Sequence, residues 1–189
     1  MTRAFWQRLL APGADGTLSR WLARNARVAP GRTLVLDVGA GDCPRLFVTG
    51  TRTVALDVDR VGLLAARRSG ALVVQASADR LPFVDEAFGA TATVGVLHHL
   101  PDAAATAAVT EMARVTARGG AVLVVDAVWP DPAWRRPLAW LIRRLDRGGW
   151  MRRETAVRQL LTPALDWRAE RRRYAATGLE ALVAHAHRS

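Results

Sequence analysis

The hydrophobic positions of the chain fall into short runs that alternate with helical patterns. Five runs are apolar, rich in β-branched residues and end in a polar or small residue: 33–39, 53–59, 71–77, 90–97 and 121–128. Such runs predict strands that are covered on both faces. The spacers at 43–49, 60–70 and 101–120 are compatible with helices. Strands that alternate with helices predict a parallel sheet with helices on both faces.

The spacer at 101–120 carries the clearest helical pattern. Val109, Met112, Ala113 and Val115 recur at helical spacing and form one apolar stripe. Glycine is common just past the end of a helix, so we expect Gly119-Gly120 to end this one.

Both ends of the chain also carry amphipathic patterns. Residues 4–28 predict helix on both sides of a break at 11–17. Near the other end, a helix is expected to have arginines largely on one face and an apolar opposite face, formed by Trp134, Leu138, Leu141, Ile142 and Leu145. A short helix at 154–161 should stop at Thr162-Pro163, and two strands around Gly178 should close the sheet as a hairpin.

These elements predict one domain over residues 1–189, a size that can bury its own core. Residues 1–30 form a helical cap, 31–128 a cofactor-binding core, and 129–189 an arginine- and tryptophan-rich part that completes the sheet. Most tryptophans of that last part are expected in the core. In such sheets the ligand binds beyond the carboxyl ends of the strands, where the topology reverses.

The charge of the chain is strongly positive and unevenly placed. The formal net charge is +10, and every basic residue is an arginine. Residues 135–173 hold twelve arginines and four acidic residues, so this segment alone carries 12 − 4 = +8. Such a surface suits nucleic acid, an anionic membrane or an acidic substrate, and it equally fits an ordinary solvated face.

The remaining composition limits the setting of the protein. Cys43 is the single cysteine, so no internal disulfide can form, and we expect a reducing compartment, the cytoplasm. The amino terminus lacks the apolar stretch of a secretory signal, and no apolar run approaches the ~20 residues that cross a bilayer. His185 and His187 have no cysteine partner, so no metal site is predicted.

A glycine-rich turn follows the first predicted strand. Gly39 and Gly41 permit a sharp bend and the close approach of a ligand to the backbone. Asp57 closes the second strand, twenty residues after Asp37, where an acid can accept both hydroxyls of a ribose. The pair predicts a cofactor that contains a nucleoside.

The residues around the turn disfavour a dinucleotide. Pro44 stands where a dinucleotide site has its third glycine, and it removes an amide that would hold a pyrophosphate. The Asp37 carboxylate repels phosphate and attracts cations. Both features favour a positively charged ligand without a pyrophosphate.

At this point the sequence resembles the class I S-adenosylmethionine-dependent methyltransferases, in particular their broad small-molecule, type 11-like group. The resemblance covers about residues 30–128, through four motifs in register: LDVGAGDC, VALDVD, VVQASADRLPFVDEAFGATATVGVLHHLPD and EMARVTARGGAVLVVDA. It implies a Rossmann-like three-layer α/β sandwich whose mostly parallel seven-stranded sheet ends in an antiparallel hairpin strand. It also implies S-adenosyl-L-methionine as the cofactor.

The resemblance implies roles for particular residues. The expected contacts are Asp37, Gly39, Ala40 and Gly41 at the methionine portion, Asp57 and Val58 at the ribose, Ser77, Ala78 and Asp79 at the adenine, and Val94 and Gly95 beneath the sulfonium. His98 and His99 would face the acceptor.

Three positions depart from the family pattern. Cys43 replaces a frequent third glycine, Ser77 replaces an aspartate near the adenine amino group, and Gly89 replaces an aspartate after a phenylalanine. These changes predict weaker cofactor binding and leave open a non-catalytic copy. A nucleotide-dependent oxidoreductase or a binding module on the same fold also stays open.

Methyl transfer from a sulfonium is an in-line displacement that depends mainly on alignment and the exclusion of water. If the acceptor is a hydroxyl, His98 or His99 is the candidate base. The alternative is a structural turn in which His99 orients the loop and Asp102 caps the next helix. Likewise, Asp37 could bind only loop amides, and Asp57 could cap a helix.

The acceptor is expected to be a small or lipid-like molecule. The stretch GVLHHLPD lacks the Asn/Asp-Pro-Pro-Tyr/Phe motif with which some nucleic-acid methyltransferases grip a flipped base, so nucleic acid ranks lower. A basic amphipathic helix that carries tryptophans also suits peripheral contact with a membrane. The oligomeric state is left open.

Overall fold

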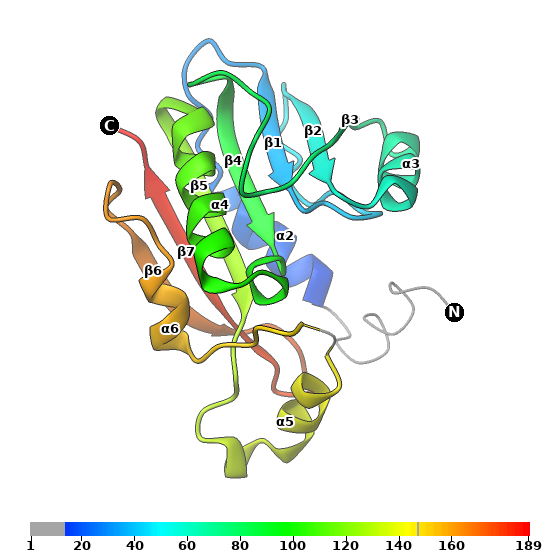
Figure 1. Ribbon diagram of the computed structural model, residues 1–189, viewed down its shortest axis with the longest axis vertical. Coiled ribbons are helices and arrows are strands. Elements are labelled where there is room, and N and C mark those ends of the chain that lie inside the picture. The colour runs from blue at the N-terminus through cyan, green and yellow to red at the C-terminus, as the bar shows by residue number, and fades with distance from the viewer. Residues whose placement is uncertain (1–13, 147) are drawn as a thin grey trace.

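The computed structural model describes residues 14–146 and 148–189, which are built around one seven-stranded sheet (Figure 1). The strands lie in the order β3-β2-β1-β4-β5-β7-β6. Their bounds are Leu34–Val38 (β1), Arg52–Asp57 (β2), Leu72–Gln75 (β3), Phe88–Val94 (β4), Thr116–Ala127 (β5), Arg168–Arg173 (β6) and Glu180–His187 (β7). Strands β1 to β5 pair in parallel, and β7 runs antiparallel to β5 and β6. The predicted α/β fold is confirmed, including the closing hairpin.

One layer of helices covers each face of the sheet (Figure 1). Helix α4 (Asp102–Val115) places Val109 and Met112 in a core with Leu36 of β1. Helix α2 (Ala14–Asn25) places Trp21 on the other face, in a core with Val35 of β1. Because consecutive residues of a strand point to opposite faces, both faces of β1 are buried, as its apolar run predicts. The part of the amino-terminal helix that we predicted at 4–13 lies outside the described residues.

Helix α3 (Arg60–Arg68) makes the crossover between β2 and β3. Asp59 caps it, because its carboxylate accepts a hydrogen bond from the Val61 amide at 3.0 Å. Leu63 and Ala66 pack against Ala55 of β2. This crossover agrees with the helix predicted at 60–70.

Two predicted helical features are wrong. The segment 43–49 forms no helix. Helix α4 ends at Val115, before Gly119-Gly120, because Thr116 is already extended and pairs with Phe88 at the start of β4. Gly120 instead permits close strand pairing, since a Cβ there would lie 2.3 Å from the Gly89 carbonyl oxygen.

The carboxyl-terminal part adds short elements, namely the 3-10 helix η2 (Ala133–Arg135), helix α5 (Pro137–Arg144) and helix α6 (Glu154–Gln159). Helix α5 lies below the carboxyl end of β5, and helix α6 lies beside β6 (Figure 1). Val128 forms a parallel bridge with Arg152. The prediction of buried tryptophans is wrong here, because Trp134, Trp140 and Trp150 are exposed and Trp129 and Trp167 are only partly covered.

Much of the arginine excess in this part serves internal ion pairs. The buried carboxylate of Glu180 contacts Arg136 and, at 2.6 Å, Arg171. Arg171 also binds Glu154 at 2.9 Å, and Arg143 donates to the Glu180 carbonyl oxygen at 2.8 Å. A buried carboxylate requires such partners because its desolvation is costly. This network holds β6, β7, α5 and α6 together.

Neutralising Glu180 should therefore destabilise the fold. We expect Glu180→Gln to lower the free energy of unfolding by about 3 kcal/mol, because it leaves the partly buried guanidinium groups of Arg136 and Arg171 without the acid that they share. Urea unfolding followed by circular dichroism measures the change. The matched control is Glu170→Gln, since Glu170 meets Arg172 at the surface and should cost less than about 1 kcal/mol. Equal losses in the two variants would contradict a structural role for the network.

Candidate functional site

The candidate site lies at the carboxyl ends of the parallel strands. Strand β1 lies between β2 and β4, so the crossovers leave it in opposite directions and the topology reverses beside it. Asp37 of β1 pairs in register with Ala55 of β2 and Ala92 of β4. The loops that follow these strands therefore share one edge of the sheet.

The glycine turn after β1 is anchored by its neighbours. Gly39 and Ala40 donate amide hydrogen bonds to the Leu56 carbonyl oxygen at 2.7 and 3.1 Å. Gly39 has a φ of 72°, and a Cβ there would lie 2.2 Å from Val96 Cγ2. By contrast, nothing lies within 4 Å of a Cβ placed on Gly41. Glycine is thus required at position 39 because Val96 packs against its backbone. At Gly41, by contrast, the space beside the backbone is open.

Asp37 lies beneath this turn and explains why no helix follows it. Its carboxylate accepts hydrogen bonds from the amides of Arg45 and, at 3.0 Å, of Leu46, whose side chain is fully buried. These bonds draw the segment 43–49 into an irregular loop that includes Pro44. Burial raises the pKa of Asp37 to about 6, while the two amides pull in the opposite direction. The alternative that Asp37 binds loop amides is thus realised in the geometry.

Asp57 joins the glycine turn to β2. Its Oδ2 accepts the Gly41 amide at 2.8 Å, and its Oδ1 accepts the Asp59 amide at 2.8 Å. The alternative that Asp57 caps α3 is wrong, since Asp59 provides the cap. The hydrogen bond therefore joins the end of β2 to the loop that follows β1, across sixteen residues of sequence.

The remaining predicted contacts line the next loops along the same edge. Ser77 and Asp79 follow β3 and are joined by a 2.5 Å hydrogen bond from the Ser77 hydroxyl, and Ala78 between them is buried. Val58 follows β2 and is exposed. Val94 ends β4, and Gly95 follows it with a φ of 68°.

Gly89, which departs from the family pattern, has a packing explanation. A Cβ at this position would lie 2.5 Å from Val28 Cγ1 and 2.8 Å from Arg32 Cβ. The backbone before β1 therefore passes too close to β4 for an aspartate to fit in this arrangement.

A buried acid and histidine form the second half of the site. His98, in the 3-10 helix η1 (Leu97–His99), places Nδ1 2.6 Å from Oδ1 of Asp126. Asp126 is buried near the end of β5, and its Oδ2 has no hydrogen-bond partner among the described residues. A carboxylate at Nδ1 favours the proton on that atom and leaves Nε2 as the basic nitrogen.

The sequence analysis missed Asp126. It could have been noticed, because it interrupts the apolar run 121–128 near its end, as Asp37 does in 33–39. What the sequence does not reveal is its partner, since His98 lies 28 residues away in an irregular loop.

The segment 148–152 closes the site over His98. Arg152 is buried and donates to the Leu97 and Leu100 carbonyl oxygens at 2.8 and 2.7 Å, and to Asp102 at 2.6 Å. The Trp150 amide donates to the His98 carbonyl oxygen at 3.0 Å. The alternative that Asp102 caps α4 is wrong, because it is the first helical residue and binds Arg152 instead.

Three side chains at this wall could together hold a divalent cation. The ligand atoms of His98, His99 and Asp146 all lie within 4.8 Å of one another. Nε2 of His98 is 3.9 Å from Oδ1 of Asp146. Two imidazoles and a carboxylate suit such an ion, although the sequence predicted no metal site.

A pocket of about 440 Å³ opens after the end of β5, between η2, α5, α6 and β6. None of the predicted cofactor residues lines it; its walls include Trp129, Trp140, Arg153 and Arg171. The Trp129 and Trp140 rings lie 6.3 Å apart at an angle of 34°. Glu154 also lines the pocket, and hydrogen bonds from Arg158 and then Arg171 lower its pKa.

Comparison with known proteins gives one consistent family. Residues 36–124 match the family described as "Methyltransferase domain". An uncharacterised methyltransferase of Mycobacterium tuberculosis is 34% identical over 138 residues, which cover 68% of this chain and 52% of the relative. The demethylmenaquinone methyltransferase of Mycobacterium marinum is 36% identical over 129 residues, which cover 66% and 54%. The chain thus spans about half the length of these curated relatives.

Solved structures share the fold at low sequence identity. The YcgJ protein of Bacillus subtilis superposes with a TM-score of 0.64 at 17% identity, covering 93% of this chain and 97% of that one. The geranyl diphosphate C-methyltransferase of Streptomyces coelicolor superposes with a TM-score of 0.70 at 9% identity, covering 93% and 81%. That second structure contains Mg²⁺, geranyl diphosphate and S-adenosyl-L-homocysteine.

The raised pKa of Asp37 makes a pH-dependent contribution to stability. The unfolded carboxyl group, at 3.8, loses its proton before the folded one, at about 6. Between these values the folded state binds more protons, so stability falls as the pH rises, by about 3 kcal/mol in total. Asp37→Asn lacks this titration, so its stability relative to the wild type should rise by about 2 kcal/mol, most of that total, from pH 4 to pH 7. Chemical unfolding over this range measures it, and a constant difference would contradict the raised pKa.

Proposed function

This chain belongs to the class I S-adenosylmethionine-dependent methyltransferase family, and from that premise we propose that it transfers a methyl group to a small or lipid-like acceptor. The observation that carries the proposal is the contact of the Asp57 carboxylate with the Gly41 amide at the switch point of the sheet. This contact places a carboxylate that can accept ribose hydroxyls next to the backbone of Gly41, which has open space beside it.

The residues present fit S-adenosylmethionine better than a dinucleotide. No helix begins after the glycine turn, so the amides that hold a pyrophosphate at a helix start are missing from this loop. The carboxylate of Asp57 lies there instead, with Asp37 buried beneath the turn, and negative charge favours a cationic ligand. Asp57 would accept the ribose hydroxyls, Asp37 would face the methionine portion, Ala78 and its neighbours would frame the adenine, and Val94 and Gly95 would form the floor.

When bound, the cofactor supplies a methyl carbon made electrophilic by its sulfonium. The chain's own residues then have to orient the acceptor and exclude water, and alignment of this kind can contribute about 7–11 kcal/mol. The segment 148–152 performs the exclusion by covering His98.

We assign the base to His98 rather than His99, because Asp126 holds His98 through Nδ1. His98 Nε2 would take the proton of an acceptor hydroxyl, and Asp126 would stabilise the resulting imidazolium. Asp126 acts through His98 and is a positioning residue.

The pocket after the end of β5 is the proposed acceptor subsite. Two tryptophan rings suit a flat or apolar group, and Arg153 suits an oxygen-rich or anionic one, whereas Arg171 is already paired with Glu154 and Glu180. Nucleic acid is a weaker candidate, because half of the arginines between 135 and 173 are held in ion pairs, namely Arg136, Arg143, Arg152, Arg158, Arg171 and Arg172. The single exposed Cys43 is compatible with a cytoplasmic setting.

The first test addresses the cofactor. Calorimetry should detect binding of S-adenosylhomocysteine and no binding of a nicotinamide dinucleotide. Asp57→Ala should weaken the binding tenfold or more, a loss of at least about 1.4 kcal/mol, because the ribose loses its acceptor. Asp85→Ala is the control, since Asp85 contacts Arg114 at the surface. Binding of the dinucleotide alone would overturn the proposal in favour of an oxidoreductase.

The second test addresses the base. We expect His98→Asn, whose amide can still donate to Asp126, to lower methyl transfer about 100-fold or more while the dissociation constant for S-adenosylhomocysteine changes less than about threefold. Transfer of a radiolabelled methyl group to a panel of phenolic and lipid-like acceptors provides the assay. The exposed His187→Ala is the control. Unchanged transfer in both His98→Asn and His99→Ala would remove the base from the mechanism.

A further inference from the structure

Helix α5 turns its apolar side chains outward. The sequence pattern predicted leucines and arginines largely on opposite faces of this helix and did not decide which face is exposed. Leu138, Leu141 and Leu145 are 53%, 48% and 70% exposed, whereas Arg143 is 6% exposed. At about 100° per residue the three leucines span one side of the helix, and Ala139 and Arg143 lie on the other.

Specific contacts hold α5 in this orientation. The inward Ala139 packs with Ala175 and Leu179. Arg143 donates to the Tyr174 hydroxyl at 2.7 Å and to the Glu180 carbonyl oxygen at 2.8 Å. The buried arginine is satisfied only with α5 turned this way, so the leucines are exposed as a consequence.

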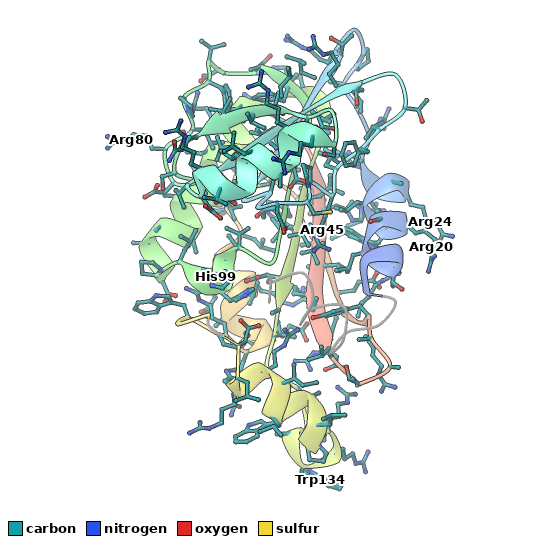
Figure 2. All side chains as sticks on the ribbon, turned by 90° about the vertical axis from the view of Figure 1, so that its right-hand side faces the viewer. Arg20, Arg24, Arg45, Arg80, His99 and Trp134 are labelled. Atoms are coloured by element: carbon teal, nitrogen blue, oxygen red, sulfur yellow. The ribbon has the colours of Figure 1, made fainter. Side chains whose placement is uncertain are left out.

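We call this exposed side the α5 outer face; it comprises Trp134, Leu138, Leu141 and Leu145 with Arg135 and Arg144, all of which are exposed. Trp134 is 75% exposed and lies at the tip of the molecule in Figure 2. The Arg135 guanidinium lies 4.8 Å from the centre of the Trp134 ring, and that of Arg144 lies 5.5 Å from the centre of the Trp140 ring. The segment 132–145 contains no acidic residue.

We propose that the α5 outer face binds the surface of an anionic lipid bilayer. Tryptophan and leucine can enter the boundary between headgroups and acyl chains, while the two arginines meet lipid phosphates. A second copy of the chain is a poorer occupant, because a self-paired face would oppose its own arginines without any acid to balance them. Nucleic acid would cover the arginines but leave three leucines in water.

The orientation also connects this surface to the pocket. Ala133 lies within η2 at the edge of the α5 outer face, and Trp140 lies on α5; both line the 440 Å³ pocket. Docking would therefore bring the pocket close to the membrane. Among the described residues no helix has the length and apolar character needed to span a bilayer, so the proposed contact is peripheral.

Vesicle co-sedimentation tests the proposal with the full chain and without cofactor or acceptor, so its outcome is separate from that of the proposed activity. We expect binding to vesicles of phosphatidylglycerol and phosphatidylcholine, and at least tenfold weaker binding to phosphatidylcholine alone. The variant Trp134→Ala/Leu138→Gln/Leu145→Gln should lower the partition coefficient at least tenfold. Arg135→Gln/Arg144→Gln should lower it about tenfold at low salt and less at high salt.

The control is Leu64→Gln/Val84→Ser, which alters exposed apolar side chains outside the α5 outer face and should leave vesicle binding unchanged. Circular dichroism verifies that each variant is folded. Failure of the wild type to bind anionic vesicles, or equal binding by the triple variant, would overturn the proposal. So would a concentration-dependent dimer in light scattering that the triple variant abolishes, because the occupant would then be a second copy.

Discussion

Three parallel strands place an aspartate near the same edge of the sheet, and each of these carboxylates has to be satisfied there. Taking a carboxylate out of water is costly unless hydrogen-bond donors replace the water. Asp37 takes the amides of the loop that follows it, Asp57 takes the amide of Gly41, and Asp126 takes the His98 ring. The shape of each loop at this edge follows from how its acid is satisfied.

This constraint links the two halves of the site. On the side of β1 and β2, Asp57 holds the amide of Gly41, whose backbone faces open space. On the side of β4 and β5, the acid orients an imidazole whose other nitrogen is left basic. In the proposed function, cofactor binding and proton transfer would therefore both depend on carboxylates at the carboxyl edge of the parallel strands.

In the carboxyl-terminal part, buried arginines take the role that buried aspartates have at the edge of the sheet. Buried Arg143 and Arg152 serve as multiple hydrogen-bond donors that hold short, irregular segments against the core. Their placement determines which sides of neighbouring elements are exposed: α5 presents its leucines to solvent, and the segment 148–152 lies over His98. Six of the twelve arginines between 135 and 173 are thus held in ion pairs, and two of these, Arg143 and Arg152, are buried.

The sequence by itself determined the sheet, the crossovers at α3 and α4, and the position of the glycine turn with Asp57. These features depend on local periodicity and on residue types at fixed spacing, which a linear sequence displays directly. It did not reveal the loop at 43–49, the outward face of α5 or the pairing of Asp126 with His98. Each of these depends on which distant group satisfies a buried polar atom: Asp37 for two loop amides, Tyr174 and Glu180 for Arg143, and His98 for Asp126. Only the tertiary structure decided them, because the hydrogen bond that outweighs local helical preference joins residues whose proximity no local pattern encodes.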